Sequence, residues 1–234
     1  MKILESIPIR LELDRILKEL HLPDEKKSPY SIRELIETAE SLIQARAVFQ
    51  VSYIQQRGIS SVTLDGITFA SRVLAVNVKN TERTFPYIIT IGKDLEDQAG
   101  SSGDLLKQFY LETMGDMALR LARDYLGEYL KKNYGIEKTA SLSPGSLKDW
   151  PITEQKLLFS LFKDKGRIGV RLTESMLMIP RKSISGIYFA TEAGFYSCQL
   201  CPRKKCPARK AAYDKTLRAT YGLEDEDADG YGSP

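Results

Sequence analysis

The three cysteines of the chain lie close together near its carboxyl end. Cys198, Cys201 and Cys206 have the spacing C-x2-C-x4-C, and a proline follows the second and the third cysteine. Thiolates at this spacing in a tight loop can converge on one metal centre, and proline often stands beside iron–sulfur ligands. The pattern therefore predicts a zinc or iron–sulfur site with these three cysteines as ligands and a fourth ligand from elsewhere.

Other interpretations of the same cysteines stay open. The basic residues Arg203, Lys204, Lys205 and Arg209 surround the thiols, and nearby cations favour the reactive thiolate. The cysteines are then redox-active thiols without a metal, or they have no function. The basic run itself either docks an acidic partner or is a solvated face.

Composition excludes several classes of function. The chain has 234 residues, of which 42% are hydrophobic and 28% charged, as in an ordinary globular protein. Its formal charge of +3 and the lack of a long basic stripe argue against a nucleic-acid partner. No apolar run approaches the roughly 18 residues of a membrane helix, and Glu5 interrupts any signal peptide. A cytoplasmic protein is expected, and its one histidine, His21, argues against histidine-based catalysis.

Hydrophobic spacing and capping residues outline the helices that must position these groups. Ser31 and Glu34 form a capping box, and Gly58 is expected to end the helix that they begin. Gly115 lies midway in a long helix, where it marks close packing or is simply tolerated. The pattern predicts helices over residues 11–20, 32–58, 104–132 and 208–221.

Strands are predicted from alternation and from turn residues. Asp65-Gly66 between alternating apolar residues predicts a β-hairpin. Further strands are predicted over residues 7–9, 85–92, 168–172 and 184–189. Residues 1–100 are expected to be integral to the same domain as a core at 101–221 that includes the cysteines. Residues 222–234 form an acidic tail that is expected to be disordered.

Four further motifs occur in a fixed order after the long helix: Pro144-Gly145, Thr153-Glu154, Leu172 to Pro180 and Ser183 to Phe189. The third contains Leu-Thr-Glu-Ser and the fourth Ser-Gly-x-Tyr-Phe. This order resembles the activation domain of cobalamin-dependent methionine synthase, convincingly over residues 104–200. The first hundred residues resemble only the stand-alone proteins of that type.

The resemblance implies an α+β fold, with long helices packed on a twisted antiparallel sheet. It implies S-adenosylmethionine as cofactor, and cobalamin presented by a partner. The chain is then a stand-alone reactivation module for a cobalamin-dependent methyltransferase in methionine biosynthesis, supporting reductive methylation of the oxidised corrinoid. Its implied partners are the corrinoid-binding methyltransferase and a flavodoxin- or ferredoxin-type electron donor.

Site residues follow from the matching positions. Ser141 stands where the family has an arginine that grips the cofactor's carboxylate, so that contact needs another cation, such as Arg171 or Arg181. Loss of such a charge-assisted bond costs about 1.5–3 kcal/mol. The resemblance assigns cofactor contacts to Ser141, Pro144, Gly145, Glu174, Phe195 and Tyr196.

Two alternatives belong to other classes of function. The first is a metal or iron–sulfur accessory protein that reductively activates a corrinoid protein through the cysteines without binding S-adenosylmethionine. The second is a pure interaction module that stabilises a corrinoid protein. The residues themselves assign no catalytic group to the chain.

Overall fold

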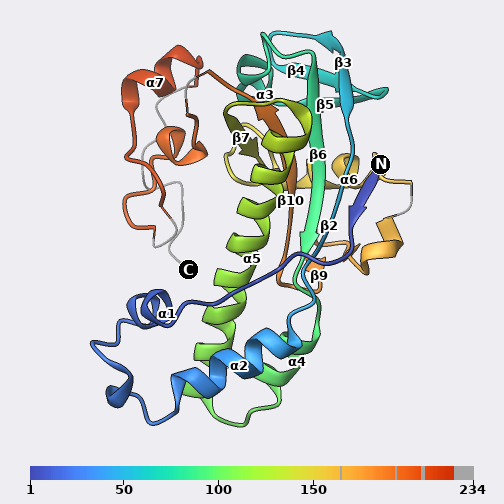
Figure 1. Cartoon of the computed structure of the whole chain (residues 1–234). Helices are drawn as coiled ribbons and strands as arrows, with labels where there is room; N and C mark the ends of the chain where they lie inside the picture. Colours follow the sequence, from blue (N-terminus) through green and yellow to red (C-terminus); the bar gives the residue numbers. More distant parts are fainter. Residues whose placement is uncertain (164, 193, 207–208, 224–234) are drawn as a thin grey trace. The chain divides into compact units, whose positions relative to one another are not determined.

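A computed structural model describes residues 1–163, 165–192, 194–206 and 209–223 (Figure 1). The chain divides into two units. Unit 1 contains residues 1–50, 87–133 and 162–185, and unit 2 contains residues 51–86, 134–161 and those from 186 onward. Each unit is thus assembled from segments far apart in sequence. The prediction that residues 1–100 belong to one domain with 101–221 stays a prediction.

Unit 1 combines a short antiparallel sheet with helices. In the sheet, β2 (Arg46–Phe49) pairs with β1 (Lys2–Leu4) and with the second half of β6 (Arg83–Thr90). The helices of this unit are α1 (Leu13–Glu19), η1 (Glu25–Lys27), α2 (Ile32–Leu42), α4 (Asp94–Gly100) and α5 (Leu105–Tyr134). Its remaining elements are η3 (Lys165–Ile168), β8 (Arg171–Leu172), β9 (Met178–Ile179) and the start of β10 (Ser183–Ala190).

Helix α2 begins where the sequence predicts but ends much earlier. The Ser31 hydroxyl accepts a hydrogen bond from the Glu34 amide at 3.3 Å, which confirms the predicted cap. The prediction of one helix up to Gly58 is wrong, because β2 and β3 (Ser52–Arg57) occupy the second half of that range. The buried apolar residues of β2 pair with β6, so tertiary burial overrides the helical spacing.

The long helix α5 agrees closely with its predicted range and stands out in Figure 1. A Cβ added at Gly115 would lie 3.4 Å from Lys182 Cε and 3.5 Å from both Ile91 Cδ1 and Leu95 Cδ2. These are ordinary van der Waals distances. Gly115 is therefore packed against its neighbours without requiring glycine. In the described part of the chain, no helix has the length and apolar character to cross a membrane.

Five charged side chains join β9 and β10 of unit 1 to its helices. Arg181 Nε and Nη2 lie 2.6 Å from Glu96 and 2.8 Å from Glu112. Lys182 Nζ lies 2.8 Å from Glu112 and 2.6 Å from Asp116. Glu112 thus forms ion pairs with both Arg181 and Lys182. The Arg181 guanidinium is thus paired with two carboxylates of unit 1 and stabilises the packing of that unit.

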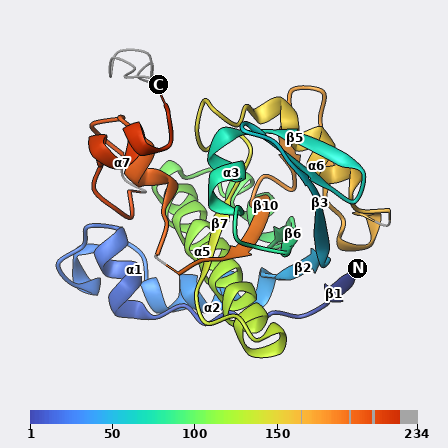
Figure 2. The ribbon, with the colours of Figure 1, turned by 90° about the horizontal axis from the view of Figure 1, so that it is seen from above.

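Unit 2 contains the other strands. The described elements are β3, β4 (Ser61–Leu64), β5 (Ile67–Ala70), α3 (Arg72–Asn77), the start of β6, β7 (Thr139–Leu142), η2 (Ile152–Glu154), α6 (Gln155–Ser160), the rest of β10, η4 (Ser197–Leu200) and α7 (Lys215–Thr220). β3 pairs with both β4 and β6, and β4 pairs with β5, all antiparallel. β7 pairs antiparallel with β10, and both views show the two strands side by side (Figures 1 and 2).

Backbone and side-chain chemistry explains one turn and one helix start of unit 2. Asp65 and Gly66 have φ angles of 48° and 82° and connect β4 to β5, so the predicted hairpin is confirmed. Asp149 caps α3: its carboxylate accepts hydrogen bonds from the Ser71 hydroxyl at 2.6 Å and from the Arg72 and Val73 amides at 3.2 and 2.9 Å.

Three other predictions need correction. Residues 7–9 form no strand, and the strand of that region is β1. Of the strand predicted over 168–172, only β8 forms, since Ile168 lies in η3 and Gly169 has a φ of 71°. Of the helix predicted over 208–221, only α7 forms in the described residues, since residues 209–214 are not helical. The predicted acidic tail lies outside the described residues from position 224 onward.

Candidate functional site

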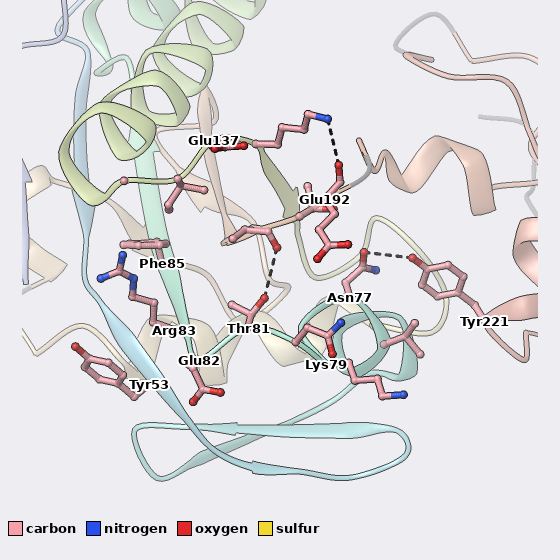
Figure 3. A pocket seen from close by; sticks show the side chains of 17 residues that line it. Tyr53, Asn77, Lys79, Thr81, Glu82, Arg83, Phe85, Glu137, Glu192 and Tyr221 are labelled. Atoms are coloured by element: carbon pink, nitrogen blue, oxygen red, sulfur yellow. Dashed lines mark hydrogen bonds between the residues drawn. The ribbon is translucent and has the colours of Figure 1, made fainter.

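A cavity of about 720 Å³ lies within unit 2, a volume typical of small-ligand sites (Figure 3). Its walls come from β3, the turn after α3, the start of β6 and the segments next to β7 and β10. Tyr221, after α7, completes the lining. All of these lining residues belong to unit 2.

Strand register locates the cavity relative to the predicted Pro-Gly loop. Thr139 pairs with Ala190 at one end of the β7–β10 ladder, and Leu142 pairs with Ile187 at the other. The cavity is lined by residues 135–138, which precede β7, and by residues 190–192, which include the last residue of β10 and the two that follow it. It therefore lies at the end of the ladder opposite to the loop that follows Leu142.

Arg83 is the most strongly oriented cation of the cavity. Its Nη2 donates a hydrogen bond to the Tyr134 carbonyl at 2.6 Å, and its guanidinium lies 5.9 Å from the Phe85 ring centroid. The Phe85 ring packs edge-to-face on Tyr134, with the centroids 5.0 Å apart. Tyr53 is the cross-strand partner of Arg83 in the β3–β6 pair. Arg83 thus has a defined position between aromatic neighbours.

Carboxylates and a second cation line other walls. Glu137 and Glu192 lie on the two segments that adjoin the β7–β10 ladder, and both are exposed (Figure 3). Lys138 Nζ donates to the Glu192 carbonyl at 3.2 Å and thereby joins these two segments. The cavity therefore offers both positive and negative groups to a ligand.

Tyr221 connects the cavity to one predicted site residue. Its hydroxyl donates to Asn77 Oδ1 at 3.2 Å, and burial raises the pKa of Tyr221 above its ordinary value. The Phe195 ring lies 5.8 Å from the Tyr221 ring, centroid to centroid, and is buried. Phe195 therefore supports the wall from behind, while Tyr196 is half exposed and is the N-cap of η4.

The predicted Pro-Gly loop is folded on itself. Ser141 is a half-buried residue of β7, and Pro144 is buried. The Gly145 amide donates to the Trp150 carbonyl at 2.7 Å, and the Ser146 amide donates to the Ser143 carbonyl at 3.1 Å. Gly145 is required, since its φ is 82° and an added Cβ would lie 2.9 Å from Ile152 Cδ1. These two amides are committed within the loop.

Glu174 belongs to unit 1, in the exposed turn between β8 and β9. The Thr173 amide donates to the Leu177 carbonyl at 2.8 Å, and the Leu177 amide donates to the Thr173 hydroxyl at 3.0 Å. The other five predicted cofactor residues belong to unit 2. None of the six is among the described residues that line the cavity.

The cysteine segment is organised by Arg209. Its guanidinium donates to the carbonyls of Cys198 at 3.0 Å, Cys201 at 3.2 Å and Ala211 at 3.2 Å, and also to that of Arg203. Four main-chain carbonyls of one loop thus converge on a single half-buried cation. The basic composition of the segment predicts a role for Arg209 beside the thiols or on a charged surface, but hydrogen bonds to main-chain carbonyls leave no motif in the sequence.

The structure does not reproduce the predicted metal centre. Cys198, Cys201 and Cys206 are half-buried free thiols. Within the described residues, no three His, Cys, Asp or Glu side chains lie together in a way that could hold a metal ion. The predicted convergence of the three thiols is therefore not seen, and the loop is instead folded around the Arg209 guanidinium.

The cavity residues were missed because they come from segments spread between Tyr53 and Tyr221, with no shared motif. The one local signal was Arg83 at the head of a strongly apolar strand. Only the fold places this cation in the lining of a cavity together with residues 135–138.

Comparisons with known proteins agree with this fold. Residues 130–208 match the family model described as "Vitamin B12 dependent methionine synthase, activation domain". Among curated proteins, none matches the chain. A solved structure, "Crystal Structure of the MetH Reactivation Domain bound to AdoHcy", matches with a TM-score of 0.56 and 16% identity, covering 80% of this chain and 72% of that one. The α+β class with an antiparallel sheet is confirmed. The chain thus resembles the activation domain of vitamin B12 dependent methionine synthase, in sequence over residues 130–208 and in fold over most of its length.

Proposed function

We propose that the chain is a stand-alone reactivation module for a cobalamin-dependent methyltransferase, with methionine synthase as the first candidate partner. The observation that carries the proposal is the activation-domain match over residues 130–208. That range includes β7, β10 and two walls of the cavity in unit 2. The fold likeness to a reactivation domain supports the same assignment.

S-adenosylmethionine, when bound, supplies the methyl group for an oxidised cobalamin held by the partner, with an electron from a flavodoxin- or ferredoxin-type donor. The family's loop position does not fit its carboxylate here, since Ser141 brings no charge and the Gly145 amide is committed to Trp150. The cavity fits better. Glu137 and Glu192 can attract a positive centre, as opposite charges at a partly screened site do.

The chain's own residues then bind and orient, and none is assigned a proton transfer. Tyr221, held by Asn77 and supported by Phe195, forms one wall. Lys138 ties the segment before β7 to the segment after β10, which keeps Glu137 and Glu192 on neighbouring segments. Such preorganised walls lower the cost of ordering a ligand.

A reactivation assay tests the proposal. Cobalamin-dependent methionine synthase without its own activation domain is prepared with oxidised, inactive cobalamin and mixed with this chain, reduced flavodoxin and S-adenosylmethionine. We expect the cob(II)alamin absorbance to give way to that of methylcobalamin only when all components are present. Omitting the chain, the methyl donor or the flavodoxin provides the controls. Equal rates with and without the chain would contradict the proposed function.

A further inference from the structure

We propose that Arg83 of β6 holds the carboxylate of the S-adenosyl ligand in the unit 2 cavity, in place of the cation that is missing at Ser141. The inference rests on the proposed function, because it assumes that an S-adenosyl ligand enters this cavity. It adds a specificity-determining residue that lies outside the range of the family match, residues 130–208.

A carboxylate removed from water needs a charged or strongly hydrogen-bonding partner. The Pro-Gly loop offers no cation for the carboxylate at the position of Ser141, since this residue is uncharged and half-buried in β7. The Gly145 and Ser146 amides are occupied within the loop. Of the two cations named as substitutes, Arg181 is paired with Glu96 and Glu112. Arg171 is an exposed residue of β8 and, like Arg181, belongs to unit 1. The partner has to come from another part of unit 2.

Three cations line the cavity, and their settings differ. Lys79 and Lys138 are exposed, and Lys138 is already engaged with the Glu192 carbonyl. Arg83 is half-buried and is held by the Tyr134 carbonyl at 2.6 Å and by the face of Phe85. Within the described residues it forms no ion pair with a carboxylate. A guanidinium with one bond fixed retains further N–H donors for a bidentate contact.

The arrangement of charge around the cavity fits an amphoteric ligand. Arg83 lies on β6, opposite Tyr53 of β3. Glu137 and Glu192 lie on other walls, next to the β7–β10 ladder (Figure 3). An S-adenosyl ligand carries a carboxylate at one end of its amino-acid part and a positive sulfonium and ammonium beside it. Arg83 thus takes the carboxylate, and Glu137 and Glu192 favour the positive groups. The third glutamate of the lining, Glu82, lies 3.7 Å from the Arg57 guanidinium, with which it forms an ion pair.

Binding of two ligands to the full chain, measured by calorimetry, tests the inference. S-adenosylmethionine and its decarboxylated analogue differ only in the carboxylate. The wild-type chain is expected to bind the former about tenfold to a hundredfold more tightly. In Arg83→Gln this preference disappears while the analogue binds as before. Arg83→Lys retains part of the preference, because the positive charge remains but the bidentate hydrogen bonding of the guanidinium is lost. The matched control, Lys79→Gln, removes another cavity cation that is exposed and should keep the full preference.

Each outcome decides a specific claim. Unchanged preference in Arg83→Gln, or no preference in the wild type, overturns the role of Arg83 and leaves the proposed function standing. Equal loss of both ligands in Arg83→Gln also overturns it, since Arg83 would then support only the cavity walls through Tyr134. Binding of neither ligand by the wild type overturns the inference together with the methyl-donor part of the proposed function.

Discussion

A single guanidinium decides the structure of the cysteine segment. Arg209 donates to carbonyls on both sides of the loop, from Cys198 to Ala211. Hydrogen bonds to a charged group are stronger than neutral ones, and several of them meet here. The spacing of the cysteines is thus compatible with a loop that needs no metal to be ordered.

Replacing Arg209 should open this loop. Arg209→Met leaves the carbonyls of Cys198, Cys201 and Ala211 without their donor, at a cost of about 1.5–3 kcal/mol. We expect the thiols to react with a disulfide reagent about tenfold to a hundredfold faster, through local opening rather than global unfolding. Lys204→Met is the matched control, since it removes an exposed charge from the same loop. Equal reaction rates in the two variants would contradict the role of Arg209.

Among the elements, α5 has a glycine that its packing does not require. The neighbours of Gly115 would meet an added Cβ at 3.4–3.5 Å. A helix interior prefers alanine to glycine by about 1 kcal/mol, because glycine loses more backbone freedom on folding. The close approach of Ile91 and Lys182 therefore accounts for part of the packing of α5, but not for the choice of glycine.

Two glycine substitutions should have opposite effects on stability. Gly115→Ala should raise the free energy of unfolding by about 0.5–1 kcal/mol. Gly145→Ala should lower it by at least about 1–2 kcal/mol, because alanine is disfavoured at a left-handed φ. The close approach of Ile152 to the added methyl group would increase that loss. Urea unfolding followed by circular dichroism measures both. A lower unfolding midpoint for Gly115→Ala would show that Lys182 and Ile91 cannot accommodate the methyl group.

At the scale of the whole molecule, stability toward acid depends on the network around Glu112. Partial burial acts to raise the pKa of Glu112, but hydrogen bonds and charge from Lys182 and Arg181 outweigh it and hold the pKa below its ordinary value of 4.5. A carboxylate whose folded pKa is depressed stabilises the protein above its unfolded pKa. That stabilisation is lost as the pH falls through the folded value.

Glu112→Gln should therefore flatten the acid dependence of stability. The variant is expected to be less stable than the wild type at neutral pH, since Arg181 and Lys182 lose a charged partner. Its stability should fall less steeply than that of the wild type from about pH 5 to about pH 3. Urea midpoints across this range provide the measurement. Glu128→Gln, which removes an exposed partner of Lys131, is the control and should follow the wild type. Parallel curves for Glu112→Gln and wild type would refute the prediction.

Local sequence signals predicted the elements whose cause is itself local. The Ser31 cap, the Asp65-Gly66 hairpin and the extent of α5 all depend on residues adjacent in the chain. The helical prediction is wrong over β2 and β3, because each of these strands is fixed by its pairing with β6. Hydrophobic spacing alone cannot distinguish a short buried strand from the continuation of a helix.

The sequence by itself determined the likeness to the activation domain, since an ordered set of motifs between Pro144 and Phe189 needs no coordinates to be recognised. Only the tertiary structure decided where a ligand can enter and which cation can meet it. The cavity walls come from distant segments, and strand register brings Arg83 and Tyr53 together while placing the Pro-Gly loop at the far end of β7. The conformation of the cysteine loop was also decided by the tertiary structure. Arg209 holds it through hydrogen bonds to main-chain carbonyls, and these carry no sequence signature.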